Sequence, residues 1–278
     1  MIKFPGTGEV SDDLANIYDQ EFFRMHEKNF PAFRELAKLI DEVNGGRSNR
    51  SIIDVGCGHG FLVESLRERG YKESYGLEGS SSARDIWPKK FHSYYTIQDL
   101  TVDSASVAVR KTDLVCSFET GEHLAERYAG PYVRLLTQHQ PRLVFFSAAT
   151  KYQDCGMNPT HVNEQPFSYW IRLFRQEKYE LDINNTVQVR NKMFTNASIF
   201  SNAPWYPKNI LIFRPDSVSD RGDDERIAGL YGSEIKWFEF RTVPNKLLAT
   251  CLVRDRQEYN YLIMDAVARA MMRLSRSL

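Results

Sequence analysis

A short glycine-rich stretch contains the residue types that suggest ligand chemistry most directly. Three glycines stand at alternate positions, Gly56, Gly58 and Gly60, and Asp54 stands two residues before the first of them. Glycine lets the backbone turn sharply and approach a ligand with no Cβ in the way. Apolar residues precede the stretch, and a helix is predicted from Phe61 onward. A buried strand, a tight glycine turn and a helix start together predict a nucleotide-sized ligand site.

Acidic residues follow the next three predicted strands. Glu78 ends the second strand, where its carboxylate can accept hydrogen bonds from both hydroxyls of a ribose. Asp99 and Leu100 follow the third strand, which places a carboxylate beside an adenine amino group and an apolar side chain on the ring. Glu119 follows the fourth strand, close to where a reacting group would lie. Acids at the carboxyl ends of successive parallel strands match the usual position of ligands in such sheets.

A second group of chemically active residues follows the fourth predicted strand. Glu119, Glu122 and His123 stand at positions i, i+3 and i+4, so a helix beginning here would project all three from one face. Two carboxylates and an imidazole suit Mg²⁺ or another divalent cation, and His161, in the loop after the fifth strand, could complete the site. We therefore predict these four residues as metal ligands, and Glu119, His123 and His161 as catalytic residues. The alternative is that the acid supports a helix start while the histidine packs or acts as a base.

The elements that must position these residues alternate along the chain. Near-continuous apolar strands separated by helices predict an α/β fold with a mostly parallel, Rossmann-like sheet covered on both faces. Strands are predicted over residues 51–55, 73–77, 94–98, 112–118, 142–147, 179–183 and 209–213. Helices are predicted over residues 12–29, 31–43, 61–69, 81–87, 122–138, 167–176 and 186–200, with the fifth broken at Gly130-Pro131.

Three segments are expected on this pattern. Residues 1–46 form a helical lid that lies across the site or covers a sheet edge, and residues 47–215 form the core domain. Residues 216–278 form an extension with a hairpin and an amphipathic helix. The apolar stripe of that helix would pack on the domain or on a second copy of the chain, as a homodimer. The chain stops soon after it, which would suit a piece of a longer protein.

Composition limits the classes of partner. Lysine plus arginine equals aspartate plus glutamate, giving a net charge of +0 over 278 residues. A neutral chain argues against broad binding to nucleic acid or to an anionic membrane, and leaves room for one local basic groove. The four cysteines form no CxxC pair, which indicates free thiols in a reducing compartment. With no apolar run long enough to span a bilayer, we expect a cytoplasmic protein acting on a small molecule.

The glycine stretch resembles motif I of the class I S-adenosylmethionine-dependent methyltransferases. Glu78 matches the ribose-binding acid of that family, Asp99 its adenine-side acid, and residues 113–116 the strand before the active centre. The resemblance covers residues 12–215 and implies a seven-stranded sheet whose last strand, residues 209–213, runs antiparallel. It also implies that Tyr18 closes over the cofactor. The cofactor-binding residues expected are Tyr18, Asp54, Gly56, Cys57, Gly58, Gly60, Glu78, Gly79, Asp99, Leu100 and Ser117.

The second group of residues is similar to a pattern in two metal-assisted O-methyltransferase groups. These are the small-RNA 3′-end 2′-O-methyltransferases and the ubiquinone-pathway catechol O-methyltransferases, which act on one hydroxyl of a vicinal pair. Members that use no metal also carry a Glu-His pair here. The segment 161–174 resembles a run in methyltransferases acting on sugars and small natural products. The function expected is methyl transfer to a hydroxyl of a small polyhydroxylated acceptor, a sugar or sugar-bearing metabolite. The alternatives are an RNA 3′-end 2′-O-methyltransferase and a cofactor-binding module without catalysis.

Overall fold

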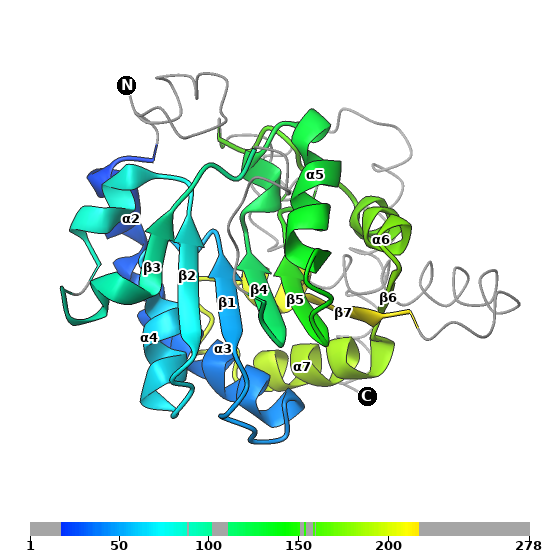
Figure 1. Cartoon of the computed structure of the whole chain (residues 1–278), viewed down its shortest axis with the longest axis horizontal. Coiled ribbons are helices and arrows are strands. Elements are labelled where there is room, and N and C mark those ends of the chain that lie inside the picture. Colours follow the sequence, from blue (N-terminus) through cyan, green and yellow to red (C-terminus); the bar gives the residue numbers. More distant parts are fainter. Residues whose placement is uncertain are drawn as a thin grey trace, which may run out of the picture. The chain divides into compact units, whose positions relative to one another are not determined.

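A seven-stranded sheet is the framework of the part of the chain that the structure describes (Figure 1). It is seen in a computed structural model that describes residues 18–87, 89–101, 111–150, 153, 158 and 160–216. The strand order is β3-β2-β1-β4-β5-β7-β6. The first five pair in parallel, and β7 is antiparallel to both β5 and β6. The predicted Rossmann-like, mostly parallel sheet with an antiparallel last strand is therefore confirmed. The strands are β1 (Ile52–Val55), β2 (Ser74–Glu78), β3 (Tyr95–Ile97), β4 (Leu114–Phe118), β5 (Leu143–Ser147), β6 (Tyr179–Leu181) and β7 (Leu211–Pro215).

Consecutive residues of a strand point to opposite faces of the sheet. Because these strands carry apolar side chains on both faces, helices cover both. Phe145 belongs to the cluster of buried residues that also includes Leu36, Leu62 and Val189. The next residue, Phe146, packs instead on helix α6, with its ring 5.0 Å from that of Trp170. The α-helices are α2 (Gln20–His26), α3 (Phe30–Val43), α4 (Phe61–Glu68), α5 (Glu126–Thr137), α6 (Phe167–Gln176), α7 (Ile183–Thr195) and α8 (Trp205–Asn209).

Register places the site-bearing strand ends together. Asp54 of β1 pairs with Gly76 of β2 on one side and with Cys116 of β4 on the other. The carboxyl ends of β1, β2 and β4 therefore meet at one edge of the sheet. The glycine turn follows β1 at this edge, while Glu78 closes β2 and Glu119 comes directly after β4.

Several predicted helices differ from those observed, including the one predicted over residues 186–200, which is α7, Ile183–Thr195. The helix predicted over residues 122–138 begins only at Glu126, because Gly121–His123 form a 3-10 turn and Leu124 is extended. The predicted break at Gly130-Pro131 is wrong, since α5 continues through Pro131. Pro131 is the sixth residue of α5, beyond the first turn, so it removes one backbone hydrogen bond and costs stability without ending the helix. The helix predicted over residues 81–87 is instead a 3-10 helix, Ser81–Asp85.

The N-terminal segment is described from Tyr18 onward. Helix α2 is followed by a 3-10 turn, Glu27–Asn29, and then by α3, in place of one helix reaching Asn29. Cys57 and Cys116 are free and buried, as predicted for them. Within the described residues, no helix is long and apolar enough to cross a membrane. The predicted C-terminal hairpin, amphipathic helix and homodimer contact lie outside the described residues, and the three-segment division stays a prediction.

Candidate active site

The glycine turn after β1 is held against the end of β2. The backbone N–H groups of Gly56 and Cys57 both donate to the carbonyl oxygen of Leu77, at 2.7 and 3.1 Å. Gly56 and Gly60 have φ angles of 79° and 75°, which favour glycine. A Cβ on Gly56 would lie 2.2 Å from Thr120 Oγ1, so the turn also packs directly on the segment after β4. The sequence requirement for glycine is therefore both conformational and steric.

Glu78 ties this turn to the loop that follows β2. One carboxylate oxygen accepts from the Gly58 N–H at 2.7 Å, and the other accepts from the Ser80 N–H at 2.9 Å. Burial raises the pKa of Glu78, and these backbone hydrogen bonds oppose the rise. Each carboxylate oxygen has two acceptor positions, so the group can still receive the two hydroxyls of a ribose.

Asp99 presents an unused acceptor. Its Oδ1 accepts from the backbone N–H and the hydroxyl of Thr101, both at 2.7 Å. Its Oδ2 is buried and has no hydrogen-bond donor among the residues that the structure describes. A buried acceptor without a donor is unfavourable, and an adenine amino group would supply the missing donor. The neighbouring Leu100 is buried close to Gly79, as a residue packing on the adenine ring would be.

Asp54 is almost fully buried, with 3% of its surface exposed. Burial, with a further contribution from the charge of Glu78, raises the pKa of Asp54 to about 8. The pKa of an aspartate in an unfolded chain is about 3.9. The folded state therefore holds this proton more tightly than the unfolded state across the intervening pH range.

Replacement of Asp54 by asparagine is expected to remove a pH dependence of stability in the cofactor-free protein. The stability that protonated Asp54 contributes is fully present below about pH 4 and is lost as pH rises towards about 8. At about 1.4 kcal/mol per pKa unit, several kcal/mol are at stake. Urea unfolding at pH 5 and pH 8 should show the parent losing stability relative to Asp54→Asn. Asp85→Asn, at an exposed position, is the control. Parallel profiles for the parent and Asp54→Asn would contradict this account.

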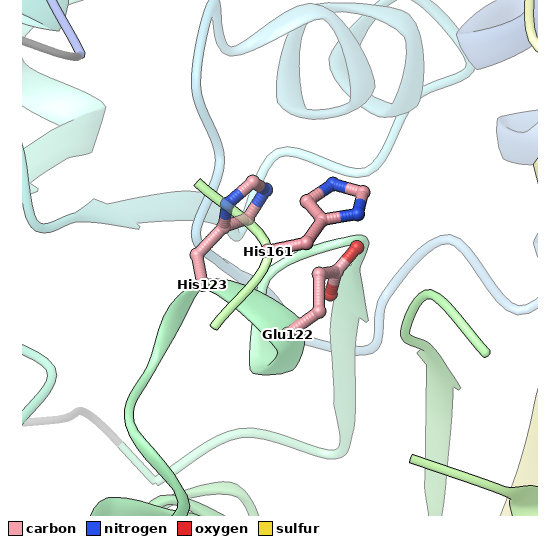
Figure 2. A group of neighbouring side chains, drawn as sticks. All are labelled: Glu122, His123 and His161. Atoms are coloured by element: carbon pink, nitrogen blue, oxygen red, sulfur yellow. The ribbon is translucent and has the colours of Figure 1, made fainter. Parts of the chain in front are cut away.

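A second cluster lies across the same edge of the sheet. Glu122, His123 and His161 each offer a ligand atom, and these atoms lie within 4.8 Å of one another. Figure 2 shows the two imidazole rings side by side, with the Glu122 carboxylate next to the ring of His161. The ring centroids of His123 and His161 are 4.9 Å apart, in an edge-to-face arrangement. Three of the four predicted metal ligands are therefore brought together, although from a 3-10 turn and a loop.

Glu122 is wholly buried, and neither of its carboxylate oxygens has a hydrogen-bond partner among the described residues. Burial raises its pKa well above the usual range, and the like charge of Glu119 raises it further. The backbone amides of Glu122 and Ala149 act in the opposite direction without reaching hydrogen-bond geometry. A buried carboxylate in this state is costly unless a cation or a donor meets it.

The two histidines are oriented by separate neighbours. His161 Nδ1 lies 2.9 Å from Glu164 Oε1. A carboxylate accepts, so this contact favours a proton on Nδ1 and a lone pair on Nε2. His123 Nδ1 lies 2.7 Å from the Tyr18 hydroxyl and 3.1 Å from the Thr160 carbonyl oxygen. Burial and the neighbouring His161 lower the pKa of His123 to about 3, so its ring is neutral.

Glu119 lies beside Glu122 but outside this trio. It has a φ of 50°, an uncommon value for a residue other than glycine. Its carboxylate accepts from Asn209 Nδ2, at 3.1 and 3.3 Å. Glu119 is near enough to influence the pKa of Glu122 but is not one of the three residues whose ligand atoms converge. The expectation that a helix would align Glu119 with Glu122 and His123 is wrong, because α5 begins at Glu126.

Three-dimensional contacts fix the segment after β4. The backbone N–H of Asn163 donates to the Glu122 carbonyl at 2.9 Å and joins the two loops that carry the histidines. A Cβ on Gly121 would lie 2.8 Å from the Trp170 ring, so that ring packs directly on the 3-10 turn. Of the predicted cofactor residues, Ser117 is wholly buried and its hydroxyl lies 2.6 Å from that of Tyr132. Its cofactor role stays a prediction, as do the other site assignments.

Sequence reasoning did not identify the residues that hold this cluster in place. Glu164 stands only three positions after His161 in the same loop, so an acid beside a candidate ligand was the available signal. Asn209 and Thr160 gave no such signal. Asn209 is 90 residues from Glu119 in the chain, and Thr160 is 37 residues from His123.

Comparisons with known proteins agree with the geometry. Residues 25–146 match the family model described as "Methyltransferase domain". The ubiquinone biosynthesis O-methyltransferase of Nitrosomonas europaea is 33% identical over 114 residues, covering 39% of this chain and 46% of that protein. This chain thus spans less than half the length of that curated relative.

Two solved structures are similar to this chain at low identity. Magnesium protoporphyrin IX methyltransferase from Synechocystis PCC 6803, with bound SAH, is 16% identical, with a TM-score of 0.49 over 61% of this chain and 90% of that one. The small RNA methyltransferase HEN1 is 18% identical, with a TM-score of 0.42 over 62% of this chain and 24% of that one. The predicted class I methyltransferase resemblance is confirmed, as a family match over residues 25–146 and as the fold of the sheet.

Proposed function

We propose that this chain, whose residues 25–146 match a methyltransferase domain, binds S-adenosylmethionine and transfers its methyl group to a hydroxyl. The observation that carries the proposal is the buried Oδ2 of Asp99, in the loop after β3, which has no donor among the described residues. Glu78 would hold the ribose, Asp99 the adenine amino group, and Leu100 the ring. Titration calorimetry with S-adenosylhomocysteine tests the proposal. One binding site per chain is expected, and absence of binding would contradict it.

When bound, S-adenosylmethionine would supply a methyl group on a sulfonium, suited to in-line displacement by an acceptor oxygen. For this chemistry the protein mainly aligns the reactants and removes the proton of the acceptor hydroxyl. The Glu122, His123 and His161 cluster lies across the same sheet edge as the glycine turn, where Thr120 packs on Gly56. We therefore propose that the methyl acceptor binds next to this cluster.

The cluster also suits a divalent cation. Glu122, with no donor on either carboxylate oxygen among the described residues, and two histidines fit such an ion in donor type and spacing. Two imidazoles favour Mn²⁺, Fe²⁺, Co²⁺ or Zn²⁺ over Mg²⁺, which prefers oxygen ligands. The ion would make a bound hydroxyl more acidic. The residues that would hold the ion are Glu122, His123 and His161.

A vicinal pair of hydroxyls is the acceptor chemistry we propose, on a small polyhydroxylated molecule. Three protein ligands leave open positions on a cation for two substrate oxygens. The relative from Nitrosomonas europaea is an O-methyltransferase by name, which supports transfer to oxygen. Turnover of S-adenosylmethionine with panels of sugars and catechols, with and without a chelator, tests this assignment. Turnover that a chelator leaves unchanged would remove the cation from the proposal.

Glu164→Gln is expected to weaken binding of Mn²⁺ by about 10–100-fold, which is typical when an outer partner of a ligand is lost. Glutamine keeps the shape of the side chain but removes the charge that orients His161 across 2.9 Å. Free Mn²⁺, followed by electron paramagnetic resonance, gives the affinity. The matched control is Glu180→Gln, an acid paired with Arg214 on a different part of the sheet. Equal affinities in the parent and Glu164→Gln would show that Glu164 does not orient His161.

A further inference from the structure

Tyr18 contacts both halves of the site. We infer that it is a positioning residue for His123 through which cofactor binding and cation binding are coupled. The inference rests on the proposed function, because it concerns the two sites assigned above. It differs from the expectation that Tyr18 simply closes over the cofactor, since its hydroxyl lies against a residue of the second cluster.

The main chain of Tyr18 is tied to the cofactor loop. The Ser80 hydroxyl donates to the Tyr18 carbonyl at 2.9 Å. The backbone N–H of the same serine donates to the Glu78 carboxylate, also at 2.9 Å. Ser80 therefore joins the acid that would hold the ribose to the main chain of Tyr18. A ligand that fixes Glu78 also restricts Ser80 and, through it, the position of Tyr18.

The side chain of Tyr18 reaches the second cluster. Its hydroxyl lies 2.7 Å from His123 Nδ1, and the rings meet edge to face with centroids 5.3 Å apart. The Thr160 carbonyl lies 3.1 Å from the same nitrogen. A carbonyl can only accept, so the Nδ1–H points to this pair of oxygens and the lone pair remains on Nε2. That nitrogen is the one that a cation would bind.

Tyr18 is also held in place by α2, the helix that begins two residues after it. Asp19, the next residue, caps α2 by accepting from the Phe22 N–H at 2.8 Å. The Phe22 ring lies 5.1 Å from that of Tyr18 and 4.6 Å from that of His26. The tyrosine is thus packed between α2 and His123, and a shift of the helix would move the hydroxyl away from Nδ1.

The charges of both sites act on the same phenol. Burial raises the pKa of Tyr18, and Glu122 and Glu78 raise it further, so the hydroxyl keeps its own proton while its oxygen accepts from the His123 Nδ1–H. Through Ser80 on one side and His123 on the other, Tyr18 connects the acid of the cofactor site with the cluster. A cofactor that orders Ser80 and Tyr18 would orient His123 for the cation. By thermodynamic linkage, the cation would then tighten the cofactor by the same factor.

The test is calorimetric titration of Mn²⁺ into the full chain, with and without saturating S-adenosylhomocysteine. In the parent, the cofactor product should tighten Mn²⁺ binding by about 5-fold or more, the usual lower range of such couplings. Tyr18→Phe keeps the ring and its packing but removes the hydroxyl, and Ser80→Ala cuts the link to the loop. Both should bind each ligand singly and lose most of the coupling. Tyr128→Phe, on α5, is the control and should keep it.

The outcomes separate this inference from the proposal beneath it. If the parent binds both ligands without coupling, or if Tyr18→Phe couples them as the parent does, the inference is overturned and the proposed function stands. If the parent binds S-adenosylhomocysteine but no Mn²⁺, the cation site and the inference both fail while the cofactor site stands. If it binds no S-adenosylhomocysteine, the proposed function itself fails.

Discussion

Glu122→Gln is expected to leave the metal-free protein at least as stable as the parent and to abolish its binding of Mn²⁺. Glu122 has 0% of its surface exposed and neither carboxylate oxygen has a partner among the described residues. Because burial raises its pKa, Glu122 must take up a proton on folding at neutral pH, whereas the amide needs none, so a gain of about 1–3 kcal/mol is expected. Loss of an outer partner of a ligand typically weakens metal binding by about 10–100-fold. Loss of the ligand Glu122 itself should weaken Mn²⁺ binding by more than that.

Urea unfolding and Mn²⁺ titration of the same preparations measure both effects. Glu126→Gln is the matched control, because Glu126 is an exposed acid in the first turn of α5. It should change neither quantity by much. A Glu122→Gln protein that is clearly less stable would show that the acid supports the fold. That result would contradict the claim that the buried Glu122 destabilises the metal-free protein.

Glu78→Gln is expected to weaken binding of S-adenosylhomocysteine by about 100-fold or more. Two ribose hydroxyls would donate to this carboxylate, and hydrogen bonds to a charged group contribute about 1.5–3 kcal/mol each. Tenfold in affinity corresponds to about 1.4 kcal/mol. The amide NH2 of glutamine would also face the backbone N–H of Gly58 or of Ser80. Two donors cannot hydrogen-bond to each other, so the turn would loosen.

Calorimetry gives the affinity, and unfolding in urea separates it from damage to the fold. We expect the variant to lose about 1–3 kcal/mol of stability from the unmatched backbone donor. Glu68→Gln, at an exposed position near the end of α4, is the control and should match the parent in both measurements. Unchanged affinity for S-adenosylhomocysteine in Glu78→Gln would place the ribose elsewhere.

The strands of the sheet were predictable because each is defined by a pattern of neighbouring residues in the sequence. Apolar runs bounded by glycine, proline and charged residues identified all seven strands, each within two residues of its observed ends. Residues placed at strand ends, such as Glu78 and Asp99, could be assigned because parallel strands bring their carboxyl ends to one edge. The glycine spacing after β1 then indicated the kind of ligand.

The cluster was only partly predictable, because contacts distant in the chain shape it. Helical spacing suggested that Glu119, Glu122 and His123 share a helix face. The packing of Trp170 on Gly121 and the hydrogen bond from Asn163 instead hold a 3-10 turn there. The contact between Tyr18 and His123 joins residues 105 positions apart. No local pattern records such a pair, so its role emerges only from the folded chain.

A crystal structure of the protein with S-adenosylhomocysteine and Mn²⁺ tests the central claim most directly. The account predicts the ribose hydroxyls on Glu78, the adenine amino group on Asp99 Oδ2, and the sulfur directed towards the second cluster. It also predicts an anomalous scattering peak among Glu122, His123 and His161. A ligand bound away from Glu78 and Asp99 would contradict the cofactor assignment, and a ligand in place with no peak at the cluster would contradict the cation.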